Sequence, residues 1–172
     1  ELFSMGVGNY TEVDVRESSR AFTGWTITPK LPRFPMGRFD WEFKYNSADH
    51  DNDEKTFLGE TGNFNGEDII DIVCQHPATA QFIARHLYNF FVADEAQVPA
   101  WETVPPRDPR AIQTMMDAYF DSGYEVRSVL RVMFNSGFFK NAVFQKIKSP
   151  TELIVGTARM AGGYRFPGLE DS

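Results

Sequence analysis

The densest group of side chains that could do chemistry is the acidic stretch 49–54, Asp-His-Asp-Asn-Asp-Glu, which is followed by Glu60. Asp49, Asp51 and Asp53 stand at positions 1, 3 and 5 of a calcium-binding loop, and Glu60 falls at position 12. Alternate carboxylates on a curling loop can turn toward one hard cation, and a distal glutamate can complete its shell. The spacing therefore makes these four residues candidate metal ligands, with calcium as the possible cofactor.

Two features of this stretch weaken the calcium hypothesis. Position 6 of the loop is Glu54, where the sharp turn needs glycine, and the flanking segments are predicted to be strands rather than helices. The alternative is a solvated acidic loop between two strands, which needs no cofactor.

His50 and Asp51 are the candidate catalytic residues, although the sequence identifies no reaction. A histidine beside an aspartate can serve as a metal ligand or as an acid–base pair. Asp51 can equally stabilise the turn by accepting backbone N–H groups. We favour the role in the turn, because the sequence offers no identifiable third partner.

No other motif in the sequence indicates a defined reaction. The three histidines lack the zinc-binding spacing H-E-x-x-H, and the glycine-rich segment 59–66 lacks the Lys-Ser/Thr ending of a phosphate-binding loop. Cys74 lies among isoleucines and a valine, which predicts a buried, inert thiol.

The three tryptophans leave two hypotheses open. Trp25, Trp41 and Trp101 lie in or beside loops with acidic neighbours, and such residues can form a platform that binds a glycan. More often they close the ends of a helical core, with the indole N–H bound to the backbone.

Length, charge and hydropathy exclude several classes of protein. The 172 residues fit a single domain, 1–172, which can bury roughly 70% of its unfolded surface. The net charge of −7 argues against a nucleic-acid partner, because binding to phosphates needs a basic face. No stretch of the sequence approaches 18 uninterrupted apolar residues, so none is expected to span a membrane.

The apolar spacing predicts a mainly α fold, an irregular bundle of about five or six helices with one two-stranded antiparallel β-ribbon. Polar caps and prolines place the expected helix starts at Thr11, Asn65, Pro77, Pro109, Val126 and Pro150. In the last helix, Leu153, Ile154 and Ala158 are expected to face the core.

The β-ribbon is predicted as an insertion over residues 38–60. Residues 38–45 alternate aromatic and polar side chains, which is typical of a half-buried strand. Its expected partner is 55–58, across the polar loop 46–54. The prolines of 25–37 are expected to prevent regular structure there. A two-stranded ribbon is marginal alone, so its aromatic face must pack on the helices.

Several stretches carry a family likeness. They are Tyr-Thr-Glu-Val-Asp-Val-Arg-Glu at 10–17, Phe-Thr-Gly-Trp at 22–25, His-Asp at 50–51, Lys-Thr-Phe-Leu-Gly at 55–59, Gly-Asn-Phe at 62–64, His-Pro-Ala-Thr-Ala-Gln-Phe-Ile-Ala at 76–84, Phe-Phe-Val at 90–92, Ser-Gly-Tyr at 122–124 and Lys-Ser-Pro-Thr-Glu-Leu at 148–153. In their order they resemble the uncharacterised bacterial family catalogued as domain of unknown function 1800, over about residues 1–162. His86 departs from the family, which tends to have a basic residue there.

The resemblance implies a setting rather than an activity. Family members are longer and largely helical, and they often begin with an export signal, which implies an extracytoplasmic location, periplasmic or secreted. They extend before Leu2 and continue past Gly163. The chain is therefore expected to be an internal fragment whose partners include the missing N- and C-terminal segments. The family has no agreed activity, so the resemblance assigns no catalytic residue.

Three functional hypotheses follow. The first is a non-catalytic helical scaffold or interaction portion of a longer exported bacterial protein. The second is part of a metal-assisted hydrolase that acts on extracellular polymers, with its site near residues 49–60. The third is a calcium- or sugar-binding module.

Overall fold

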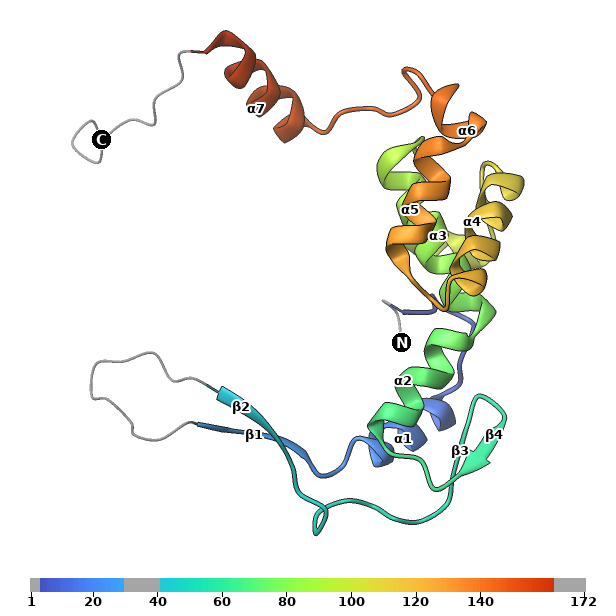
Figure 1. The fold of residues 1–172 in the computed structure, drawn as a ribbon, viewed down its shortest axis with the longest axis vertical. Helices are drawn as coiled ribbons and strands as arrows, with labels where there is room; N and C mark the ends of the chain where they lie inside the picture. The colour runs from blue at the N-terminus through green and yellow to red at the C-terminus, as the bar shows by residue number, and fades with distance from the viewer. Residues whose placement is uncertain (1–3, 30–40, 163–172) are drawn as a thin grey trace, which may run out of the picture.

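The computed structural model describes residues 4–29 and 41–162, and it confirms the mainly helical class (Figure 1). In chain order the elements are α1 (Glu12–Ala21), β1 (Trp25–Pro29), β2 (Trp41–Tyr45), β3 (Lys55–Phe57), β4 (Glu60–Gly62), α2 (Gly66–Gln75), α3 (Pro77–Phe91), the 3₁₀-helix η1 (Val98–Glu102), α4 (Pro109–Asp121), α5 (Val126–Asn135), α6 (Gly137–Lys140) and α7 (Pro150–Ala161). The helices thus number seven within the described residues, of which α6 is a single turn.

Polar caps start the helices where the sequence predicts them. At α1, the Thr11 hydroxyl accepts from the Asp14 N–H at 3.2 Å and the Asp14 carboxylate accepts from the Thr11 N–H at 2.8 Å. His76 separates α2 from α3, and its Nδ1 accepts from the Ala78 N–H at 3.1 Å. These bonds satisfy N–H groups that a helix leaves free at its start.

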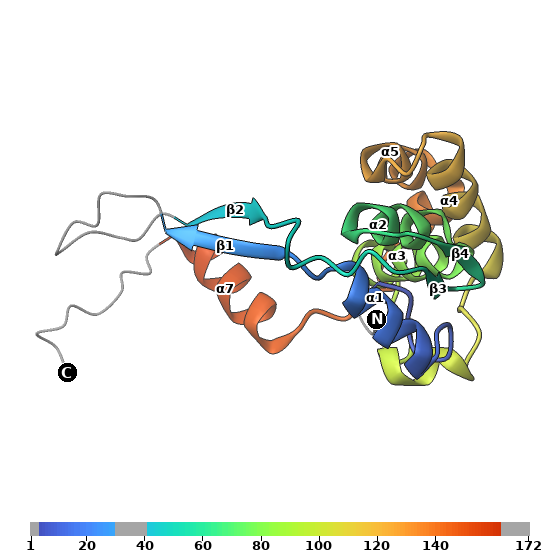
Figure 2. The same ribbon diagram turned by 90° about the horizontal axis from the view of Figure 1, so that it is seen from below.

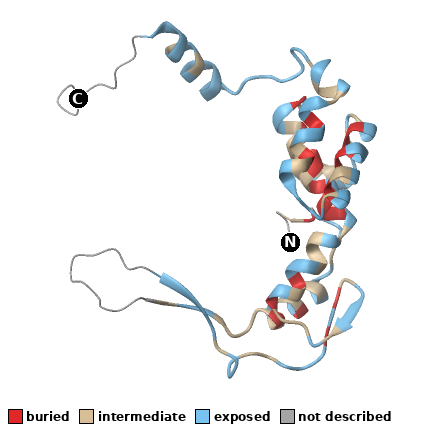
Figure 3. Ribbon diagram, in the orientation of Figure 1, coloured by how far each residue is buried: buried red, intermediate tan, exposed pale blue. Residues whose placement is uncertain are grey.

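The main core lies between α3, α4 and α5. Met115 of α4 and Met133 of α5 are completely buried, and Tyr88 of α3 packs with them. Figure 3 shows buried stretches of α3, α4 and α5 where the three helices meet. Ile112, Met115 and Tyr119 of α4 recur at helical spacing and face this core.

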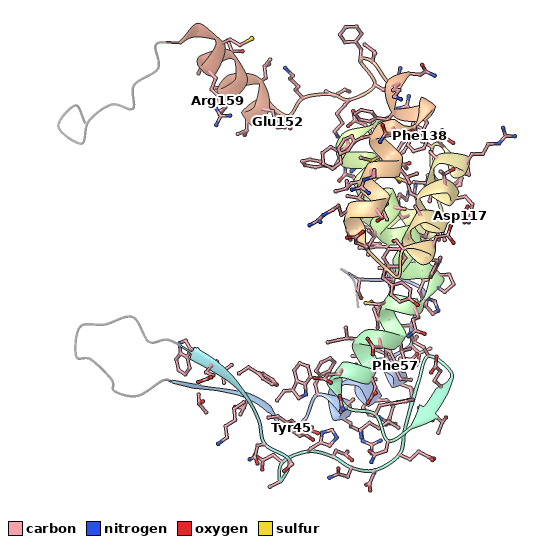
Figure 4. The ribbon with its side chains drawn as sticks, viewed as in Figure 1. Tyr45, Phe57, Asp117, Phe138, Glu152 and Arg159 are labelled. Atoms are coloured by element: carbon pink, nitrogen blue, oxygen red, sulfur yellow. The ribbon has the colours of Figure 1, made fainter. Side chains whose placement is uncertain are left out.

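A second, smaller core joins α1, α2 and β3. Ala21, Phe57 and Ile69 are its buried residues, with Phe22 and Phe64 packed against them. Phe57 is labelled in Figure 4 at this junction. Because the acidic loop 46–54 runs directly into β3, this small core sets where that loop lies.

The structure corrects the predicted pairing of the strands. β2 pairs with β1, in the register Trp25↔Tyr45 and Ile27↔Phe43, and not with 55–58. β3 pairs instead with β4 through the two-residue turn Leu58-Gly59, where both residues have positive φ, as a type I′ hairpin requires. Residues 38–40 of the predicted ribbon lie outside the described residues.

The expectation that 25–37 lacks regular structure is therefore wrong for 25–29. Trp25-Thr26-Ile27-Thr28 alternates apolar with hydroxyl-bearing side chains, and all four residue types favour strands. Pro29 stands at the end of the strand, where a proline is tolerated, and residues 30–37 of this expectation lie outside the described residues.

The aromatic face of the β1–β2 ribbon does not pack on the helices, contrary to expectation. The ribbon extends away from the helices (Figure 1), and Trp41 and Phe43 are each 58% exposed. Trp25, at the base, contacts Phe22 of α1 edge to face, with ring centroids 5.0 Å apart. The ribbon is thus attached to the helices at its base, and more than half of the Phe43 side chain is exposed.

The inward orientation predicted for the last helix is also wrong for two residues. Leu153 and Ile154 of α7 are 57% and 67% exposed, and α7 stands away from the other helices (Figure 1). The amphipathic stripe is real, but a stripe specifies which side is apolar and not which element covers it. α7 ends as predicted, at Gly162 with φ of 69°.

The segment before α7 is fastened to the end of α3. The carboxylate of Asp94 accepts from the N–H of Ile147 at 2.9 Å and pairs with the ammonium of Lys146. The start of α7 is therefore held at the end of the body formed by α3, α5 and α6. No helix among the described residues is long and apolar enough to cross a membrane.

We predict that Met115→Ala lowers the free energy of unfolding by about 2–5 kcal/mol, because it leaves a cavity where α4 meets α3 and α5. The matched control is Gln113→Ala on the exposed side of α4, where the change should stay within about 0.5 kcal/mol. Urea unfolding followed by circular dichroism measures both. Equal losses in the two variants would contradict this description of the core.

Candidate functional site

The acidic loop is bound to α1 by a bidentate ion pair between Asp51 and Arg20. Arg20 Nε donates to Asp51 Oδ2 at 2.7 Å, and Arg20 Nη2 donates to Asp51 Oδ1 at 3.2 Å. The third nitrogen, Nη1, donates to the buried Glu17 at 2.5 Å. The Arg20 guanidinium thus lies between two carboxylates and neutralises charge on both.

Thr23 binds the backbone and the histidine of the same loop. Its hydroxyl accepts from the N–H of Asp51 at 2.8 Å, and its carbonyl oxygen lies 2.9 Å from His50 Nδ1. Because a carbonyl can only accept, Nδ1 of His50 carries a hydrogen. His50 is therefore oriented by Thr23, while the carboxylate of Asp51 is oriented by Arg20.

The turn role favoured for Asp51 is visible in the structure. Its Oδ1 accepts from the N–H of Asp53 at 2.9 Å, which closes a local turn. Its hydrogen bonds to Arg20 and to that backbone N–H, with the positive charge nearby, lower the pKa of the Asp51 carboxyl from 3.8 to about 2. Asp51 is thus held as an anion, whose lone pairs already accept from an arginine and a backbone amide.

Lys55 is a buried charged residue that sequence reasoning missed. It is 1% exposed, and its ammonium donates to the backbone oxygens of Asp51 at 2.5 Å and Asp53 at 2.9 Å. The alternation of β3 contained the signal, because Lys55 shares the inward side with buried Phe57. Lys55 therefore stabilises the turn at Asp51 and Asp53 from the buried side of the loop.

The four predicted metal ligands are not gathered around one point. Asp51 binds Arg20, Asp49 accepts from the Asn46 amide at 2.5 Å, and Asp53 is exposed. Glu60 lies on β4 and is exposed. In the part of the chain that the structure describes, no group of three or more His, Cys, Asp and Glu side chains is arranged to hold a metal ion.

A buried ion pair, Arg85–Glu95, which sequence reasoning also missed, holds the loop between α3 and α4. Arg85 Nη2 and Nε donate to Glu95 Oε2 at 2.9 Å and 3.2 Å, and both side chains are almost completely buried. Arg85 also donates to the backbone oxygens of Val104 and Pro105 at 2.9 Å and 3.1 Å. One cation therefore fixes both ends of the loop 92–106.

Trp101 of η1 closes this region. Its indole N–H donates to the carbonyl of Ala96 at 2.7 Å, its ring lies 4.6 Å from the Arg85 guanidinium carbon, and it contacts the rings of Phe82 and His86. Burial lowers the pKa of His86. This is the arrangement expected of a tryptophan that closes a helical core.

Two cavities lie beside these elements. The larger, of about 510 Å³, is bounded by segment 5–9, the first half of α3 and η1, with Gln81 and Glu102 among its polar side chains. The smaller, of about 230 Å³, lies between α1 and α2 and is mostly apolar. Cys74, expected to be buried, is partly exposed and lines the smaller one.

These observations define a mainly helical protein in which ion pairs and charged hydrogen bonds connect loops to helices and strands. Residues 1–170 match the family described as "Protein of unknown function (DUF1800)", and the chain belongs to that family. The resemblance seen in the sequence is thereby confirmed. No curated protein and no solved structure matches the chain.

We predict that the Arg20–Asp51 pair makes stability depend on acid pH. The pKa of Asp51 is about 2 in the folded protein against an ordinary value of 3.8, so the folded state favours the ionised carboxyl. This stability is complete above about pH 4 and is lost as the pH falls through 2. Asp51→Asn should therefore flatten the fall of the urea midpoint between pH 4 and pH 2.

The control for this prediction is Asp71→Asn, on the exposed side of α2. It should leave the pH profile of the urea midpoint parallel to that of the unaltered chain. If the pH profile of Asp51→Asn is also parallel to that of the unaltered chain, the Arg20–Asp51 pair contributes no pH-dependent stability and the prediction is wrong.

We predict that Arg85→Met lowers the free energy of unfolding by about 3–5 kcal/mol, because it leaves Glu95 buried without its partner. Adding Glu95→Leu should restore part of the loss, since the lone charge is then removed. The exposed Arg127→Met on α5 serves as the control, with an expected change within about 0.5 kcal/mol. Chemical unfolding measures all of these variants, and simple additivity of Arg85→Met and Glu95→Leu would be the contrary result.

Proposed function

We propose that this chain is a non-catalytic scaffold and interaction portion of a longer exported bacterial protein. In this proposal its apolar surfaces dock further protein segments, including those that flank it. The extracytoplasmic location belongs to the proposal and is supported only by the resemblance to family members that begin with an export signal.

The observation that carries the proposal is the apolar segment between α6 and α7. Phe144 is 99% exposed, and its neighbours Val143 and Ile147 are 63% and 79% exposed. Phe144 also has φ of 62°, a conformation that costs an L-residue with a bulky side chain roughly 1–2 kcal/mol. A fully exposed phenylalanine in an unfavourable conformation is reasonable if the side chain is an anchor that a partner covers.

A docking role accounts for several other exposed apolar residues better than isolated surface positions would. These residues lie on the β1–β2 ribbon, on α7, and at Phe90 and Phe134 near the end of α3 and α5, whereas others, such as Val13 and Ile70, are scattered over the helices. Large contiguous apolar surfaces are uncommon on monomeric proteins and usually mark interaction sites.

The hydrolase alternative has less support, because the side chains of His50 and Asp51 are already bound to residues in or just after α1. Asp51 is held by Arg20, and His50 by Thr23. A general base or nucleophile needs access to a substrate, and these two groups have structural partners instead. The sugar-binding alternative is weakened at Trp101, whose ring already contacts Arg85 and His86.

We predict that Phe144→Asn has opposite effects in two contexts. In the 172-residue chain it should leave the melting temperature unchanged or raise it, because asparagine adopts positive φ at lower cost. In the full-length product of the gene it should lower the melting temperature, because a covered anchor is lost. Calorimetry on both proteins measures the difference.

The matched control is Lys148→Asn, also exposed in the same segment, which should have the same small effect in both contexts. If Phe144→Asn behaves alike in the chain and in the full-length product, the docking proposal is wrong. A melting temperature of the chain that rises in calcium chloride relative to EDTA would instead favour the calcium-binding alternative.

A further inference from the structure

Two elements of the chain present apolar faces that the rest of the body leaves open. On the β1–β2 ribbon, the antiparallel register puts Ile27, Phe43 and Tyr45 on one side, with Trp41 beyond them. Thr26, Thr28, Glu42 and Lys44 form the opposite, polar side. The apolar side chains are 45–61% exposed. We call this side the ribbon face.

On α7, Leu153, Ile154 and Met160 lie within one apolar arc of about 120° around the helix, since Met160 at i+7 projects nearly as Leu153 does and Ile154 lies about 100° from Leu153. They are 57%, 67% and 83% exposed, and we call this side the α7 face. A helix of 12 residues and a two-stranded ribbon are each marginal in water without a surface to pack on. Both elements therefore need a partner.

The two elements project from opposite ends of the body toward the same side (Figure 1). Viewed at right angles, they again point in one common direction away from the helices (Figure 2). Glu152 and Arg159 on α7 and Tyr45 at the base of the ribbon mark the two ends in Figure 4. The ribbon and α7, which we call the two arms, thus present the ribbon face and the α7 face as two separate sites that border the same space.

We infer that the occupant is a second copy of this chain: the α7 face of each copy covers the ribbon face of the other. This inference rests on the proposed docking function and names its partner. A half-turn about an axis through the space between the arms, perpendicular to the view of Figure 1, brings each α7 beside the other copy's ribbon. One two-fold operation satisfies both faces of both copies and closes the assembly as a dimer.

The exposed area is sufficient for a stable pair. An aromatic side chain can bury about 150–250 Å², so the half-exposed residues of one ribbon face and one α7 face offer together roughly 900 Å². Two symmetric contacts remove roughly 1,800 Å² from water, within the range of specific interfaces of standard size. Their apolar and aromatic composition is that of an interface core.

Pairing within a single copy is disfavoured by the attachment of α7. Asp94 holds Ile147 and Lys146 at the end of α3, and α7 begins three residues after Ile147. A helix of 12 residues is about 18 Å long. The ribbon starts beside α1, at the other end of the body (Figure 1). Because α7 is held at its start, it projects away from the body and not along the body toward its own ribbon.

Analytical ultracentrifugation of the 172-residue chain tests the association. We expect a dimer, and we expect Phe43→Thr on the ribbon face and Ile154→Ser on the α7 face each to weaken it by at least about tenfold. The matched controls are Lys44→Thr and Arg159→Ser on the same elements, which should change the dissociation constant by less than about threefold. Circular dichroism verifies that each variant is folded.

Cysteine cross-linking tests which faces meet. In a Cys74→Ala background, Ile27→Cys and Ile154→Cys are made in separate chains, one carrying a mass tag, then mixed and oxidised. We expect a disulfide between the two different chains, and a much lower yield when Thr28→Cys on the polar side replaces Ile27→Cys.

Each other outcome overturns the reciprocal pairing. A monomer at all concentrations does so, as does a dimer cross-linked ribbon to ribbon. So does a chain carrying both cysteines that forms only an internal disulfide. These results leave the docking function standing if Phe144→Asn still destabilises the full-length product, because Phe144 lies outside both faces.

Discussion

The packing of α3 against α4 and α5 is the contact on which the rest of the structure depends. It buries Met115 and Met133 completely and surrounds them with Tyr88, Val129 and Tyr119. Because α3 is joined to α2 by only His76, the same helix also sets where the smaller core of α1, α2 and β3 begins. Most of the buried apolar residues belong to these two cores, and none of the described residues of the ribbon or of α7 does.

Buried and partly buried charges in this protein connect elements that the apolar cores do not reach. Arg20 and Lys55 bind the acidic loop to α1 and β3, and Arg85 binds Glu95 and the loop that leads to α4. Each cation donates to backbone oxygens or to a carboxylate, so its desolvation is compensated. The consequence for function is direct: side chains that resemble a reactive cluster in the sequence are engaged in holding loops.

Apolar side chains, and not charged ones, distinguish the exposed parts of the chain that pack on no other element. Aromatic and aliphatic side chains lie on the two arms and on the segment around Phe144, in a chain with a net charge of −7. A net charge away from zero opposes non-specific association, while apolar faces remain available for specific contacts. A scaffold role and a reciprocal pair of copies both use this combination, and neither requires a reaction.

What the sequence by itself determined is local. The caps at Thr11, Asn65 and Ser149, the proline-started helices and the stripe of α4 could all be predicted, because each depends on residues within a few positions of one another. The turn role of Asp51 was accessible for the same reason.

Only the tertiary structure decided which strand pairs with β2, that Lys55 is buried and that Leu153 is exposed. A period of two or of 3.6 residues identifies an apolar side, but the element that covers it is chosen by competition among distant segments for a limited core. The arginine of α1 and the aspartate of the loop illustrate this most clearly, since 31 positions separate Arg20 from Asp51 and no local pattern connects them.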